Sequence, residues 1–138
     1  MLLVLTPDAR STAGVLLLTL VAVESGGWFM LRVVRGQRPA TEFQRAFFRA
    51  GHAHAGVLVT LSLVSQLLVG ATGLSGVWAV LTNGVWAAAI LMPAGFFLSA
   101  AGRDRTQPNR LIVLLYAGIV ALAVGVISLG LGLLGGAA

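Results

Sequence analysis

The chain has 138 residues, of which 58% are hydrophobic and 9% charged, with a net charge of +5. Soluble domains carry about 25% charged residues, so this composition excludes an ordinary soluble domain. The chain contains no cysteine, which excludes disulfides, thiolate nucleophiles and cysteine-ligated metals. The positive charge does not indicate nucleic-acid binding, because the arginines flank apolar segments where membrane topology explains them.

Four apolar segments dominate the sequence, at roughly residues 12–33, 50–71, 77–101 and 111–134. Each exceeds the about 20 residues that a helix needs to cross a bilayer. Together they use most of the chain, which predicts one all-α integral membrane domain over residues 1–138, a four-helix transmembrane bundle. Thr6 as N-cap and Pro7 as first helical residue should start the first helix.

Eight of the nine arginines lie near or within the connections after the first and third segments, whereas the connection 70–76 is uncharged. The positive-inside rule therefore places these two basic loops in the cytoplasm and both termini outside. All basic residues are arginine, a bias typical of GC-rich bacterial genomes, so we expect a multi-pass protein of the bacterial cytoplasmic (inner) membrane. The arginines expected to contact lipid headgroups are Arg32, Arg35, Arg45, Arg103, Arg105 and Arg110.

Turn and cap residues place several helix boundaries. Thr41 and Gln44 match a capping box, so the second helix should begin near Glu42. Pro93 should kink the third helix, and Asn109 should cap the fourth.

Two side-chain pairs are expected to interact. Phe43 and Phe47 lie four residues apart and should turn a shared face toward acyl chains. Gln66 and Asn83, on helices joined by a short loop, should form a hydrogen bond with each other.

Small residues in the spans indicate where helices approach one another. The expected helix-contact residues are Gly26, Gly27, Gly51, Ala55, Ala117, Ala121 and Gly125.

Glu24 is the most costly residue of the spans, because a charge near the centre of a membrane helix costs at least about 2.5 kcal/mol. Its carboxyl group must therefore face the bundle interior or a cavity. Counted from Arg32 and Arg49 at the cytoplasmic boundary, Glu24 lies roughly 12 Å deep and His54 roughly 7.5 Å deep. This difference predicts contact between Glu24 and His54, with His52 nearer the headgroups.

The two histidines lie two residues apart, and so point about 200° apart around a helix and cannot chelate one metal ion together. We expect no metal site and no cofactor. Haem is an alternative, with one histidine and Met30 or Met92 as ligands. The candidate ligand or proton site consists of Glu24, Arg49, His52 and His54.

The layout resembles that of the MAPEG family, the membrane-associated proteins of eicosanoid and glutathione metabolism. Those small four-helix proteins have a basic first loop and an Arg-Ala-His motif leading into the second helix. Here Arg49, Ala50 and His52 stand at that place, with Gly51 inserted. The segment GRDRTQPNR is similar to the family's basic third connection. The family motif continues with Asn and Glu, where this chain has alanine and glycine, so the resemblance implies a glutathione-dependent membrane transferase only as an alternative.

The expected function is that of a non-enzymatic oligomeric or accessory subunit, with membrane lipids, further copies or other membrane subunits as partners and no nucleic acid. One alternative is transport of protons or small solutes by Glu24 and His54. The other is a MAPEG-like transferase or a haem binder that uses His52, His54 and the first-loop arginines.

Overall fold

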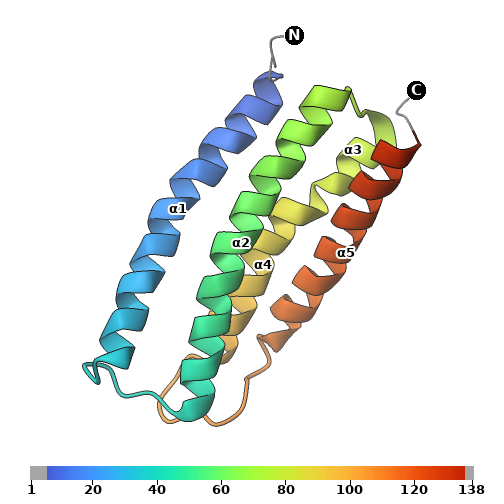
Figure 1. Cartoon of the computed structure of the whole chain (residues 1–138). Coiled ribbons are helices and arrows are strands. Elements are labelled where there is room, and N and C mark those ends of the chain that lie inside the picture. Colours follow the sequence, from blue (N-terminus) through green and yellow to red (C-terminus); the bar gives the residue numbers. More distant parts are fainter. Residues whose placement is uncertain (1–5, 136–138) are drawn as a thin grey trace.

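The structure is a computed structural model that describes residues 6–135, and this part of the chain is all-helical (Figure 1). Its helices are α1 (Pro7–Val34), α2 (Glu42–Thr72), α3 (Gly76–Thr82), α4 (Gly84–Ser99) and α5 (Ile112–Leu134). With α3 and α4 taken as one span, the four helices are long and apolar enough to cross a membrane, as a multi-pass membrane protein requires. Figure 1 shows connections 35–41 and 100–111 at one end, called here the arginine-rich end. The terminal end lies opposite.

The predicted starts of the first two helices are confirmed. The side chain of Thr6 accepts a hydrogen bond from the backbone N–H of Ala9, and Pro7 opens α1. Thr41 and Gln44 form the complete capping box, with both N···O distances 3.1 Å, and α2 begins at Glu42. These caps satisfy backbone donors that the first helical turn leaves without partners.

The third span is not the single helix over 77–101 that the sequence predicts. It breaks at Asn83, whereas Pro93 lies inside the continuous helix α4. Thr, Asn and Gly are weak helix formers, and the Thr82 hydroxyl donates to the carbonyl of Trp78 at 2.8 Å. Beside the break, the side chain of Gln66 reaches Asn83 at 3.5 Å, which confirms the predicted pairing in a long, weak form.

Helices α4 and α5 pack backbone to backbone through glycines. A Cβ atom built on Gly84 would lie 2.2 Å from the carbonyl oxygen of Ala121, and one on Gly125 would lie 2.6 Å from the backbone nitrogen of Val85. In lipid, helices associate by such close van der Waals contact, because burial of apolar surface provides little driving force for helix association there. Ala121 and Gly125, two of the expected helix-contact residues, lie at this close approach.

The predicted contact at Ala117 is wrong. Ala117 is exposed, and the next residue, Gly118, faces α4, where an added Cβ would lie 2.5 Å from Cγ of Met92. The buried side of α5 runs through Leu115, Gly118 and Gly125, so at this turn the contact position is Gly118, about 100° around the helix from Ala117. On α2, Gly51 is buried against Phe96 and Phe97 of α4, and Ala55 is buried.

All six phenylalanines of the chain gather toward the arginine-rich end of the bundle, from α1, α2 and α4. The ring of Phe29 lies edge-on to Phe48, with centroids 5.2 Å apart, and Phe48 stacks on Phe97 at 5.6 Å. Phe43 and Phe47 share a face as predicted, but they are half-buried, and Phe47 packs on a ring of α4. They therefore contribute to the packing between helices, which corrects the expectation that they turn toward acyl chains.

Gln44, in the first turn of α2, attaches connection 100–111 to this helix at the arginine-rich end. It is buried, and its amide nitrogen donates to the carbonyls of Ala100 at 2.9 Å and Gly102 at 2.7 Å. The hydroxyl of Thr41 donates to the carbonyl of Arg105 in the same connection. Farther along this connection, Asn109 accepts from the backbone N–H two residues later at 2.8 Å and shapes a turn, so α5 starts later than predicted, at Ile112.

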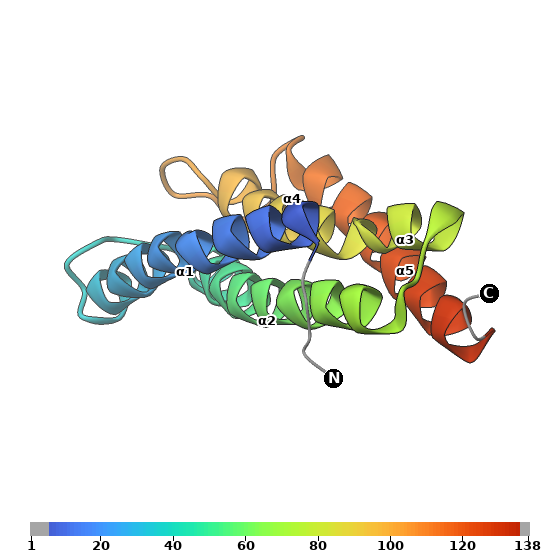
Figure 2. The same cartoon turned by 90° about the horizontal axis from the view of Figure 1, so that it is seen from above.

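Helix α1 is the most peripheral span. Only 11% of its most apolar window is buried, against 28–39% in the other three spans. It packs mainly on α2, whereas α4 packs on both α2 and α5. Both views show α1 running beside α2 (Figure 1 and Figure 2), and Figure 1 shows α5 on the opposite side of the bundle. The core of the molecule is therefore formed by α2, α4 and α5.

Replacing Gly125 with alanine should lower the free energy of unfolding by about 1–3 kcal/mol, because the new methyl group meets the backbone of α4. The matched control is Gly130→Ala on the same helix, where nothing lies within 4 Å of an added Cβ. It should be neutral or stabilising by up to about 1 kcal/mol, since alanine favours helix over glycine. Unfolding by denaturing detergent in micelles measures both; equal effects would contradict the close contact.

Replacing Gln44 with glutamate should loosen connection 100–111. The isosteric carboxylate cannot donate to the two carbonyls, which costs about 1–3 kcal/mol for groups left without partners. Trypsin should then cleave after Arg103 and Arg105 faster than in the unchanged protein. The control is Gln37→Glu, at an exposed glutamine of the other connection; unchanged cleavage in the Gln44 variant would rule out the joining role.

Candidate functional site

The structure places Glu24 on the outward side of α1, where its side chain is exposed. Among residues 6–135, Glu24 has no hydrogen bond or ion pair; the one ion pair there joins Arg103 and Asp104 at 3.4 Å. The expected contact with His54 is therefore wrong within a single chain. Glu24 lies ten residues from the last residue of α1, about 15 Å along the axis and close to half the thickness of a hydrocarbon core.

Helix periodicity explains why Glu24 turns away from the other helices. Gly26 and Gly27 face α2, and each residue advances about 100° around the helix. Glu24 therefore points about 200° away from Gly26 and about 60° away from Gly27, which is about 110° from the mean direction of the two glycines. The prediction matched the depth of the carboxyl group to that of His54 but left its direction around the axis out of account.

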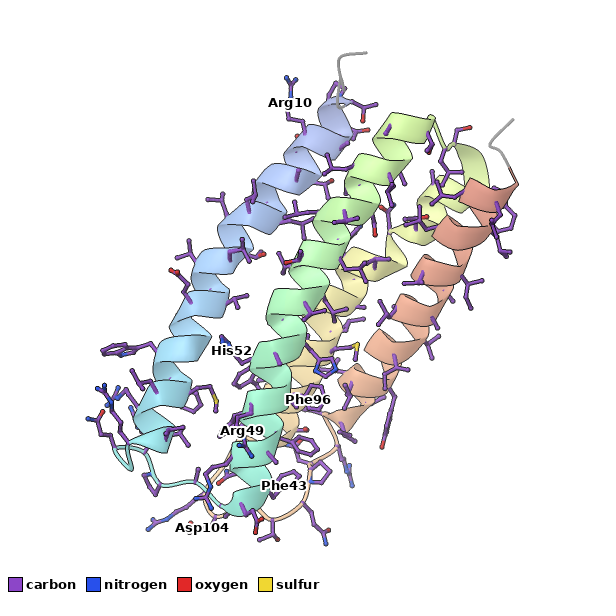
Figure 3. All side chains as sticks on the ribbon, viewed as in Figure 1. Arg10, Phe43, Arg49, His52, Phe96 and Asp104 are labelled. Carbon is purple, nitrogen blue, oxygen red and sulfur yellow. The ribbon has the colours of Figure 1, made fainter. Side chains whose placement is uncertain are left out.

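His52 takes the place beside α1 that was expected for His54. A Cβ built on Gly26 would lie 3.4 Å from Nδ1 of His52, and one on Gly27 would lie 3.3 Å from Cε1. These two glycines, expected as helix-contact residues, thus lie beside the ring of His52. Figure 3 shows the imidazole of His52 between α1 and α2. In the described part of the chain neither of its ring nitrogens has a hydrogen-bond partner.

His54 faces α4. Its Nδ1 lies 2.7 Å from the carbonyl oxygen of Ala50, and its ring packs on Phe96 with centroids 5.0 Å apart. Because a carbonyl oxygen only accepts, Nδ1 carries the hydrogen of this bond. His54 thus has a local structural partner, and the two imidazoles point to different neighbouring helices.

A partly enclosed cleft with a volume of about 510 Å³ lies between α1 and α4, with α2 as its floor. Val15 and Thr19 line it from α1, Ala55 and Val59 from α2, and Ile90 from α4. Val15 and Ile90 are 62% and 59% exposed, so the cleft can be reached from the side of the bundle. Its volume falls in the range of small-molecule sites, about 300–1,000 Å³.

His52 is the one titratable residue in this cleft. It lies near one end, with Gly26 of α1 and Phe97 of α4 also in the lining, while Ser11 and Thr12 mark the other end. The walls between are almost entirely apolar. Of the four candidate site residues, the structure thus brings only His52 to a cavity.

The arginines remain on the surface. Arg49 is exposed and does not line the cleft. Two others bond to backbone carbonyls, Arg45 to Ala40 at 2.8 Å and Arg105 to Ala101 at 2.7 Å. Arg35, Arg45, Arg103 and Arg110 are exposed, and Arg32 and Arg105 are half-buried. This placement is compatible with contacts to headgroups.

No group of three or more His, Asp or Glu side chains that could hold a metal ion occurs within residues 6–135. The chain also matches no protein-family model, no curated protein and no solved structure.

Sequence reasoning missed the cleft and two aromatic residues that line it. The cleft itself depends on α1 standing apart from α4, which no single segment reveals. Trp86 and Phe97 of α4 also line it, whereas aromatic residues in apolar spans are ordinarily read as packing or interfacial groups. The spacing of His52, Ala55 and Val59, at three and seven residues, is the one available signal of their shared face.

Proposed function

We propose that the protein is a subunit of a membrane assembly, joined to a second copy of itself through the outward face of α1. The observation that carries this proposal is the exposure of Glu24 near the middle of a membrane-length helix. A carboxyl group at that depth needs a hydrogen-bonding neighbour, which no other described residue of the same chain supplies.

The outward face of α1 has the spacing of a helix–helix seam. Six exposed residues follow one another at alternating intervals of three and four, as in the a and d positions of a packed helix pair. They form the surface called here the Glu24 stripe: Gly14, Leu17, Val21, Glu24, Trp28 and Leu31. The aliphatic members and Trp28 supply contact area, and Glu24 lies in the central part.

A second copy suits this stripe because Glu24 can serve as its own partner. In a two-fold symmetric contact, residues near the axis meet their equivalents. A carboxylic acid group carries both a donor and an acceptor, so two of them can bond without any other residue type. No arginine other than Arg10 lies outside the arginine-rich end and its helix termini, so the chain offers Glu24 no cation at its own depth.

The proposal includes the location and orientation expected from the sequence. With the arginine-rich end in the cytoplasm, the positive-inside rule is met by eight arginines against one. Both termini then lie outside a bacterial inner membrane, and lipid headgroups meet the exposed arginines.

The alternative functions receive less support from the geometry. A proton path through Glu24 and His54 would have to join two side chains that face different neighbours. A haem or transferase site built from both histidines and Arg49 would likewise need groups that the fold points apart.

Disulfide formation in native membranes tests the seam, because the chain has no cysteine of its own. The variants Leu17→Cys, Val21→Cys and Trp28→Cys should give disulfide-linked homodimers under mild oxidation. The controls Val57→Cys and Val120→Cys, at positions 66% and 63% exposed on α2 and α5, should not. Equal dimer yields on all helices, no dimers, or adducts only to a different protein would contradict a symmetric contact through α1.

Substitution of Glu24 tests the role of its carboxyl group. Glu24→Leu should weaken dimerisation roughly 5- to 30-fold, as expected for a membrane hydrogen bond of about 1–2 kcal/mol. Glu24→Gln should largely retain the dimer, because an amide also donates and accepts. Energy transfer between labelled copies in vesicles measures both, with Glu42→Leu as a control outside the stripe. A Leu variant that dimerises as the unchanged protein does would remove Glu24 from the interface.

A further inference from the structure

The cleft between α1 and α4 is independent of the Glu24 stripe. Its lining residues on α1 include Val15, Thr19 and Gly26, which lie on the side of the helix opposite Glu24. An occupant of the cleft and a partner on the stripe can therefore bind at the same time. The question is what the cleft admits.

The dimensions of the cleft fit one hydrocarbon chain. From Ser11 to Gly26 its lining extends along α1 for about 22 Å at 1.5 Å per residue. The volume of about 510 Å³ is small for this length, because a helix about 10–12 Å wide fills at least about 1,700 Å³ over the same distance. A helix therefore does not fit. A single hydrocarbon chain is thin enough, since carbon atoms in contact lie about 3.5–4.0 Å apart.

The length of the cleft favours a long chain. One leaflet of a bilayer provides about 15 Å of hydrocarbon, half of a core about 30 Å thick. The cleft exceeds this by several ångströms and continues past the midplane. A linear chain longer than one leaflet occupies it more completely than an ordinary phospholipid tail does.

The end of the cleft at His52 selects the head of the ligand. The imidazole has unused hydrogen-bonding capacity, and the aromatic ring of Phe97 lies in the same lining. No arginine or acidic residue lines the cleft, so a charged head would be placed without a counter-charge in an apolar site, which is costly. A neutral carbonyl that accepts a hydrogen bond from the imidazole matches this end.

From these features we infer that the cleft binds a lipid with one long hydrocarbon chain and a neutral carbonyl-bearing head, the chemistry that a membrane quinone presents. His52 donates a hydrogen bond to a carbonyl oxygen of the head. Gly26 and Gly27 leave room for the imidazole beside α1, and Val59, Ile90 and Pro93 contact the chain.

The test uses the full chain in phosphatidylcholine nanodiscs titrated with ubiquinone-10. Binding is followed by quenching of tryptophan fluorescence, because Trp86 lines the cleft. Saturable quenching should occur and should shrink in Trp86→Phe but persist in Trp78→Phe. His52→Leu should weaken binding about tenfold, the effect expected of one buried hydrogen bond.

Two further variants separate cleft binding from general partition into lipid. Ala89→Phe places a ring in the cleft and should abolish saturable quenching, whereas Ala123→Phe, at an exposed site of α5, should leave it unchanged. Circular dichroism confirms that each variant is folded. Quenching equal in Ala89→Phe and the unchanged protein, or unaltered by His52→Leu, would overturn the inference. So would tighter binding of oleate, because it would show that the site prefers a charged head.

Discussion

The direct contact between the backbones of α4 and α5 is the interaction on which the rest of the bundle depends. Two glycines, Gly84 and Gly125, bring main-chain atoms of the two helices within reach, where any side chain would hold them apart. In a bilayer this closeness is itself the source of stability, because lipid tails solvate apolar side chains as well as another helix does. With α2 packed against α4, the three helices complete a core without α1.

The peripheral place of α1 follows from that core, and both proposals follow from α1. On one side, α1 touches α2 but stands off from α4, and the gap forms the cleft with His52 near its end. On the opposite side, the helix turns Glu24 outward. The two polar groups that sequence reasoning would place in one site therefore belong to separate surfaces. The occupants proposed for these surfaces differ accordingly, a second copy of α1 on one and a single lipid chain on the other.

The parts of the structure set by local chemistry could be predicted from the sequence. The apolar lengths identified the four spans, and the capping box at Thr41 identified the start of α2 because its hydrogen bonds involve neighbours three residues apart. The side of a helix on which a residue faces its neighbours was harder to predict from the sequence. Ala117 and Gly118 are both small residues, and only the packing of α5 shows which of them faces α4. The same ambiguity misplaced Glu24, since depth along a span can be counted but its facing side depends on neighbouring helices.

The hydrogen bonds of Gln44 and Thr41 have a mechanical consequence for the arginine-rich end. They attach the backbone of connection 100–111 to the start of α2. The backbone positions of arginines from distant parts of the chain are therefore held relative to one another. An array of fixed charges loses little freedom when each further contact forms, unlike charges on independent arms. An anionic surface that contacts this end would therefore bind several arginines cooperatively and also dissociate from them cooperatively.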